Sequence, residues 1–197
     1  MHASPTLLHP VISVDPFAKW GIDFVTCNPP SSVGHNYIIV AVDYFTKWAE
    51  ALPTYNTDGE TATLFLFNQV IYHFGVPRRI VADHGSHFQN HMMSDLTSLL
   101  GFHQDQSSSY YPQANGQMEA VNGFLKTMIS RLVGNHKTNW HRMLYSVLWA
   151  YRTSVKIATG FTLFQLSYGL EAVLPIECQI PSLQIAIEPL PDTTAEE

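Results

Sequence analysis

The most constraining feature of this sequence is a carboxylate inside an apolar run. Asp23 stands in the middle of the run WGIDFV at positions 20–25. Such a run predicts a strand buried in a sheet, where a carboxylate is costly unless a cation or hydrogen bonds compensate its charge. The run therefore predicts a strand of a packed sheet and, on it, a charged site.

Further acidic residues stand in similarly informative places. Asp83 ends a second apolar run, IVAD at 80–83, and a turn follows it. Glu119 is the first acidic residue of a long helical pattern. Mg²⁺ prefers hard oxygen ligands and keeps several waters, so a few carboxylates suffice to hold it. Together, Asp23, Asp83 and Glu119 predict a two-metal site for phosphoryl transfer.

The remaining pattern predicts an α/β chain. Strands are expected at 20–27, 37–43, 48–52, 79–83 and 102–106, the first two as a hairpin and the third ending at Pro53. Helices are expected from a cap at Thr57 or Asp58 to a stop at Gly75, and over 90–100, 113–133, 140–151 and 162–168. Asp43 is expected in a hairpin or at the surface, and Glu50 at an exposed strand position.

Two of these helices have predicted faces. The spacing places one broad apolar face on the first helix, formed by Leu64, Phe67, Val70, Ile71 and Phe74. In 113–133 the core face is expected to consist of Val121, Leu125, Met128 and Leu132. Glu119, Asn122 and Lys126 then share a second face, which combines a candidate metal ligand with a lysine that can contact a phosphate.

Composition favours one soluble, intracellular domain. A chain of 197 residues with 46% apolar content can bury one sizeable core. No signal peptide and no membrane-spanning run is apparent. With Cys27 and Cys178 alone, the chain has neither a disulfide framework nor a Cys₄ zinc site.

Several separate sequence words resemble those of one family. They are DHGSHF (83–88), PQANGQME (112–119), AVDYFTKWAE (41–50), FGVPR (74–78), AYRTS (150–154) and TGFT (159–162). Their order and spacing are similar to the catalytic core of retroviral and retrotransposon integrases, with the closest likeness to plant long-terminal-repeat elements of the Ty3/Gypsy type. The resemblance covers about residues 9–182. It implies a ribonuclease H-like fold, with a mixed five-stranded sheet flanked by helices.

The resemblance also implies a domain organisation. Residues 1–15 correspond to a linker after a missing zinc-binding module, 16–175 to the catalytic core, and 176–197 to an extended, partly disordered tail. It further implies a homodimer or higher homo-oligomer that acts on DNA in the nucleus or cytoplasm, without a membrane or a small-molecule substrate.

The resemblance assigns roles to the acidic residues. Asp23 would bridge two Mg²⁺ or Mn²⁺ ions, and Asp83 and Glu119 would each complete one. Attack by water gives 3′-end processing of DNA, and attack by the resulting 3′-hydroxyl gives strand transfer. The residues expected at DNA are Lys126, Asn122, Gln117, Gly116, Asn115, Gln113 and Tyr111.

Other interpretations remain open. The net charge of −6 is unusual for a DNA-binding domain, because such domains generally carry a basic excess. The chain departs from the family pattern at Ser109, Tyr111, Ala120 and Leu163, where Pro, His, Arg and Pro are usual, and at Asp105, where a basic residue is common. A non-catalytic protein that keeps the fold for dimerisation or DNA association is one alternative. A nuclease that cuts RNA in hybrids is another, and a zinc site at His84, His87 and His91 is a minor one.

Overall fold

The computed structural model describes residues 15–83, 85, 87–106, 112–133 and 137–173. Its centre is a five-stranded sheet in the order β3-β2-β1-β4-β5. The strands are β1 (Lys19–Thr26), β2 (Tyr37–Asp43), β3 (Ala49–Thr54), β4 (Arg79–Ala82) and β5 (His103–Gln106). β1, β2 and β3 pair antiparallel, whereas β4 pairs parallel with both β1 and β5. The predicted mixed sheet and its hairpin are confirmed.

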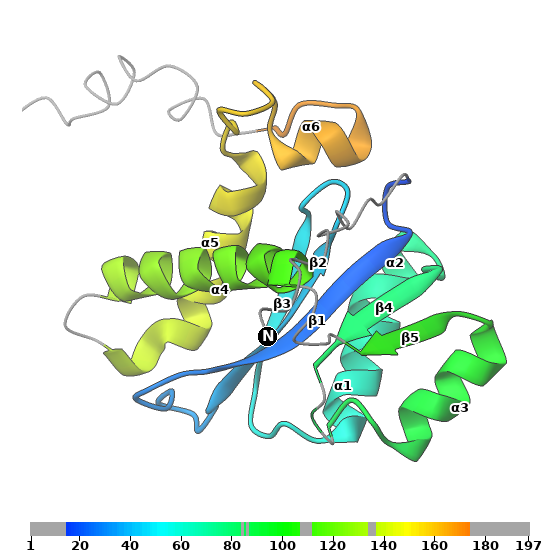
Figure 1. The fold of residues 1–197 in the computed structure, drawn as a ribbon. Coiled ribbons are helices and arrows are strands. Elements are labelled where there is room, and N and C mark those ends of the chain that lie inside the picture. The colour runs from blue at the N-terminus through cyan, green and yellow to red at the C-terminus, as the bar shows by residue number, and fades with distance from the viewer. Residues whose placement is uncertain (1–14, 84, 86, 107–111, 134–136, 174–197) are drawn as a thin grey trace, which may run out of the picture.

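The helices are arranged on both faces of this sheet (Figure 1). They are α1 (Gly59–Phe65), the π-helix η1 (Leu66–Ile71), α2 (Tyr72–Phe74), α3 (His91–Leu100), α4 (Pro112–Val133), the 3₁₀ turn η2 (Lys137–Asn139), α5 (Trp140–Thr153) and α6 (Leu163–Tyr168). Side chains alternate along β1, so Trp20 packs against Phe74 of α2 on one face, while Asp23 contacts α4 on the other. The core lies between these layers, and its fully buried members include Trp20, Ile38, Ile39, Leu66, Phe88 and Leu144.

Short polar signals determine where several helices begin and end. Asp58 caps α1 by accepting from the amide of Thr61 at 2.8 Å, which decides between the two predicted caps. Asn90 caps α3 in the same way, and Gly101 ends that helix in the left-handed conformation. No helix in the described part of the chain is long and apolar enough to cross a membrane.

Strand β3 extends further than predicted. It continues through Pro53, which pairs with Ile38, to Thr54. Proline is tolerated here because β3 is an edge strand, and the missing N–H falls on the side without a neighbour.

The predicted helix faces were partly wrong. Leu64 and Phe67 are exposed, and Ala62, Phe65, Leu66 and Val70 form the buried side instead. The π-helical segment η1 changes the helical repeat in the middle of this stretch, so a 3.6-residue period does not follow the buried face. On α4, Leu132 is exposed, and Met118 and Ile129 are buried beside Val121 and Leu125.

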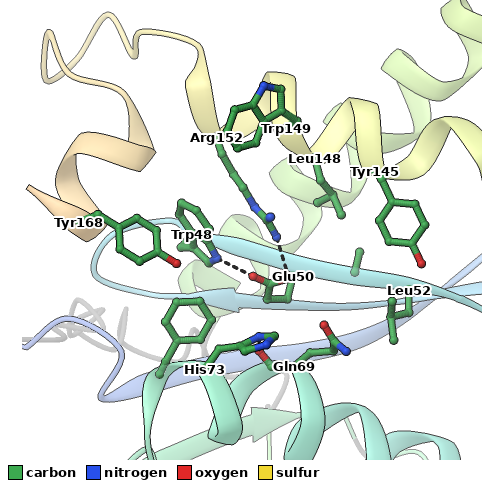
Figure 2. Close-up of a pocket in the computed structure, with 12 residues that line it drawn as sticks. Trp48, Glu50, Leu52, Gln69, His73, Tyr145, Leu148, Trp149, Arg152 and Tyr168 are labelled. Atoms are coloured by element: carbon green, nitrogen blue, oxygen red, sulfur yellow. Dashed lines mark hydrogen bonds and ion pairs between the residues drawn. The ribbon is translucent and has the colours of Figure 1, made fainter. Parts of the chain in front are cut away.

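Asp43 ends β2 at the turn of the β2–β3 hairpin, so its predicted hairpin position is confirmed, whereas the expectation of an exposed Glu50 was wrong. Asp43 is fully buried and accepts from the amides of Phe17 and Thr46 and from the Thr46 hydroxyl. Glu50 lies under α5, where it pairs with Arg152 at 2.7 Å and accepts from the Trp48 indole at 2.8 Å (Figure 2). In both places hydrogen bonds compensate the buried charge.

Candidate active site

The parallel pairing of β1 with β4 brings Asp23 and Asp83 together. Ile22 pairs with Ala82. The residues that follow them, Asp23 on β1 and Asp83 directly after β4, therefore lie beside each other. The sheet thus joins carboxylates that are far apart in the sequence. The two carboxylates also interact electrostatically, because the negative charge of Asp83 raises the pKa of Asp23.

Asp23 is held in a fixed orientation. Its Oδ1 accepts from the amide of Phe24 at 2.8 Å, and its Oδ2 accepts from the side-chain amide of Asn122 on α4 at 2.9 Å. Burial is the main cause that raises the pKa of Asp23 above its usual value, and the charge of Asp83 adds to it. The hydrogen bonds from Phe24 and Asn122 act in the opposite direction.

Asp83 sits at the end of β4 and is more exposed. Its Oδ1 accepts from the amide of Gly85 at 2.9 Å and lies 3.4 Å from Nε2 of His87. The His87 ring packs edge-on against Phe24, the neighbour of Asp23. His87, considered above for a zinc site, therefore faces the carboxylate pair. His84 lies outside the described residues, and His91 is exposed at the start of α3.

Helix α4 runs alongside β1 in the same direction. Met118 lies over Gly21, Asn122 bonds to Asp23, and Lys126 lies near Cys27 beyond the end of the strand. Glu119 is exposed and lies one helical turn before Asn122, on the neighbouring part of the same face. The predicted face formed by Glu119, Asn122 and Lys126 therefore lies alongside β1.

The side chains here suit a hard divalent cation. Asp23, Asp83 and Glu119 offer carboxylate oxygens, which Mg²⁺ and Mn²⁺ prefer. The Oδ1 atom of Asn122 is buried beside Asp23 and has no hydrogen-bond partner among the described residues. A cation would offset both this unsatisfied oxygen and the repulsion between Asp23 and Asp83. The described residues do not, however, include three acidic, His or Cys side chains gathered closely enough to enclose a metal.

A cavity lies beside α4 and has Lys126 of the predicted helix face in its lining. It is lined by Thr26, Cys27, Asn28, Pro29, Ile38, Lys126, Ile129, Ser130 and Trp140. Burial raises the pKa of Cys27 to about 11, although the Lys126 ammonium lowers it, so the thiol stays neutral near pH 7. The sequence did not indicate that Cys27 and Trp140 line a cavity together with Lys126, because no local pattern shows which side chains lie beside a helix after packing.

The sequence matches the profile of the integrase core domain over residues 14–112, half of the chain. This chain belongs to the integrase core domain family. That match includes Asp23 and Asp83, the carboxylates that the sheet brings together.

Relatives of this integrase core are retroviral polyproteins. It is 29% identical over 173 residues to the Pro-Pol polyprotein of Simian foamy virus type 3 (strain LK3), which covers 88% of this chain and 15% of that polyprotein. It is also 29% identical over 155 residues to the Pol polyprotein of Radiation murine leukemia virus (strain Kaplan), covering 78% of this chain and 26% of the relative. The chain thus spans a small part of the length of these relatives.

Solved integrase structures share the fold of this integrase core. The HTLV-2 integrase catalytic core domain, solved in complex with magnesium in a trimeric form, superimposes with a TM-score of 0.66 at 18% identity, covering 80% of this chain and all of that one. The catalytic core domain of BIV integrase gives a TM-score of 0.65 at 21% identity, covering 78% and 95%. The ribonuclease H-like architecture predicted from the sequence is therefore confirmed.

The predicted DNA contacts of this integrase core are described only in part. Asn122 and Lys126 lie beside β1, and Gly116 is exposed on α4. Tyr111 lies outside the described residues, and so do the side chains of Gln113, Asn115 and Gln117. Their roles stay predictions.

Proposed function

We propose that this chain is the catalytic core of an enzyme that integrates retrotransposon DNA into target DNA by metal-dependent phosphoryl transfer. The observation that carries the proposal is the pair of carboxylates, Asp23 and Asp83, held side by side with Asn122 oriented onto Asp23. Membership of the integrase core domain family supports it. The proposed reactions are 3′-end processing and strand transfer.

Each residue has a defined part in this mechanism. Asp23, Asp83 and Glu119 would hold Mg²⁺ or Mn²⁺. A bound pair of such ions activates the attacking oxygen and stabilises the leaving oxygen of an in-line displacement. Asn122 would keep the Asp23 carboxylate oriented through its hydrogen bond, and the exposed Lys126 would contact a DNA phosphate. No covalent protein intermediate is required, because water or a DNA 3′-hydroxyl supplies the nucleophile.

The origin and setting of the protein are part of the proposal. The sequence words that resemble plant Ty3/Gypsy elements support a retrotransposon source. A core that acts on chromosomal DNA would work in the nucleus, and we propose that it does so as a homodimer or larger homo-oligomer with basic flanking modules. Among solved structures with this fold are a trimeric integrase core and an intasome, which supports the proposed assembly.

Metal binding provides the first test. Mn²⁺ at a hundred times its dissociation constant should stabilise the folded chain by about 2.7 kcal/mol, which raises the melting temperature of a chain of this length by roughly 5–11 °C. Asp83→Asn should weaken the response because it removes a charged ligand. Asp95→Asn, which removes the same charge from the exposed face of α3, is the matched control and should respond like the wild type. Equal shifts in the wild type and Asp83→Asn would contradict the site.

Catalysis is tested on a preassembled branched DNA. Such a substrate supplies the positioning that flanking modules would otherwise provide, so the isolated core should resolve it with Mn²⁺ while failing at full integration. Glu119→Gln should abolish this reaction, whereas Glu60→Gln, an exposed residue in the first turn of α1, should leave it unchanged. Cleavage of RNA in a hybrid without any reaction on branched DNA would instead support the ribonuclease H-type alternative.

A non-catalytic role in DNA association or dimerisation is the second candidate. The net charge of −6 and the position of Glu119 outside a closed carboxylate cluster favour it. The deciding variant restores the usual family residues, as Tyr111→His with Ala120→Arg. If this variant resolves branched DNA and the wild type does not, the chain is a decayed enzyme. If both are inert, the binding role is preferred.

A further inference from the structure

The Met118 side chain of α4 packs directly onto Gly21 of β1. A Cβ atom added there would lie 2.8 Å from Sδ of Met118 and 2.8 Å from the hydroxyl oxygen of Tyr44. Real Cβ atoms essentially never lie closer than 3.0 Å to a neighbouring atom, so an alanine at this position would displace the Met118 or the Tyr44 side chain. Gly21 is not among the glycines with positive φ. The glycine is therefore required for space and not for its backbone conformation.

This contact and the Asp23 hydrogen bond belong to the same packing. Gly21 and Asp23 are two residues apart on one face of β1, a separation of roughly 6.6–6.8 Å. Their partners on α4, Met118 and Asn122, are four residues apart, about 6 Å along a helix. The spacing of Gly21 and Asp23 along β1 thus matches the spacing of their partners along α4. Because Glu119 directly follows Met118, the position of Met118 determines where the Glu119 carboxylate can reach.

Tyr44 forms a rigid support for this contact. Its side chain is buried, with Val81 of β4 as a packing partner. Its amide donates to the carbonyl of Lys19 at 2.9 Å, and its carbonyl accepts from Lys47 at 2.6 Å. Burial raises the pKa of Tyr44 to about 12, so its hydroxyl stays neutral at ordinary pH. The hydroxyl lies beside Gly21, where an added Cβ would meet it together with Met118.

We propose that Gly21, Tyr44 and Met118 are positioning residues that set the height of α4 above β1 and so bring Glu119 within reach of a cation on Asp23 and Asp83. This inference rests on the proposed function, since it concerns the same metal-dependent site. It predicts that bulk added at Gly21 alters metal binding without touching any ligand.

The experiment compares two glycine-to-alanine changes on the wild-type chain. Mn²⁺ affinity is measured by titration calorimetry, and folding by the melting temperature without metal. Gly21→Ala should weaken Mn²⁺ binding by roughly 10- to 100-fold, as expected when the groups that orient metal ligands are disturbed. Gly123→Ala is the matched control, because Gly123 is exposed on α4 and nothing lies within 4 Å of its added Cβ. Its Mn²⁺ affinity should equal that of the wild type.

Rescue separates positioning from a general loss of stability. Adding Tyr44→Phe to Gly21→Ala removes the oxygen that the new Cβ meets, and should restore part of the Mn²⁺ affinity. If Gly21→Ala does not fold, Met118→Ala becomes the deciding variant, because it removes the side chain that spaces α4 from β1, and its affinity should fall as well. Wild-type affinity in a folded Gly21→Ala or Met118→Ala protein would overturn the proposal, as would a loss that Tyr44→Phe leaves unchanged.

Asp83→Asn tells this inference apart from the proposed function. If Asp83→Asn weakens Mn²⁺ binding and Gly21→Ala does not, the metal site stands and the positioning role is rejected. If the wild type and Asp83→Asn bind Mn²⁺ equally, or the wild type binds none, both the proposed function and this inference fail.

Discussion

The ion pair between Arg152 and Glu50 offers a sharp test of how α5 is fixed to the sheet. The Arg152 guanidinium lies 2.7 Å from the Glu50 carboxylate and donates two hydrogen bonds, at 3.1 and 2.6 Å, to the carbonyl of Ala49 on the edge strand β3. It also lies over the Trp48 ring, 4.5 Å from its centroid. Figure 2 shows Arg152 reaching from α5 to Glu50 between Trp48 and Leu148. Arg152→Met keeps a long apolar side chain and removes the charge and all donors.

The expected loss follows from the burial of the pair. The Arg152 and Glu50 side chains are only 16% and 12% exposed. Removing one partner of a buried pair costs about 3–5 kcal/mol, because the other charge remains buried and uncompensated. Residual exposure and the Trp48 indole, which still donates to Glu50, place the loss near the lower end, at about 3 kcal/mol. For a chain of this length the melting temperature should fall by roughly 6–12 °C.

The measurement is urea unfolding followed by tryptophan fluorescence, with a matched control. Arg78→Met breaks the pair of Arg78 with Asp15, whose side chains are 76% and 48% exposed, and should cost no more than about 1 kcal/mol. Glu50→Gln combined with Arg152→Met should be less destabilised than Arg152→Met alone, because no charge stays buried. A loss in Arg152→Met equal to that in Arg78→Met would refute this reasoning.

Other predictions concern the DNA-facing side and its surroundings. Lys126→Ala should weaken DNA binding and reduce the slope of log affinity against log salt by about 0.9, the share of one phosphate contact, as measured by fluorescence anisotropy; an unchanged slope would remove Lys126 from the interface. In a Cys178→Ser background, Cys27 should react slowly with iodoacetamide at pH 8 and faster by about tenfold per pH unit until its pKa near 11; a plateau near pH 9 would contradict its burial. Burial, and to a smaller extent the charge of His141, lowers the pKa of His35 in the folded chain. As the pH drops below about 6.5, His35 is therefore protonated in the unfolded chain before it is protonated in the folded chain, and the free energy of unfolding falls. His35→Phe keeps the stack on Tyr55 and should therefore flatten the fall in melting temperature between pH 7 and pH 5, whereas an identical profile would assign that fall to other groups.

Local sequence patterns predicted much of the fold. Apolar runs indicated β1, β2 and β4, because a buried strand needs apolar side chains on both faces, whereas β5 consists of polar residues. Polar caps at Asp58 and Asn90, and the glycine at 101, marked helix ends within a residue, because they satisfy backbone groups within one turn. Where the backbone left the regular repeat, as in η1, the predicted apolar face moved and Leu64 became exposed.

The acidic triad was predicted from the sequence alone, because a carboxylate in or at the end of an apolar run is unusual and the surrounding words resemble those of integrases. Only the tertiary structure decided which carboxylates meet. The parallel register of β1 and β4 places Asp83 beside Asp23, and α4 contributes Asn122 through packing on Gly21. The burial of Asp43 and Glu50 was likewise decided by partners elsewhere in the chain, Phe17 and Arg152. A sequence pattern reflects interactions within one turn or one strand, so it predicts local structure. The partner of a buried charge comes from a distant segment, and which segment that is depends on how the chain packs.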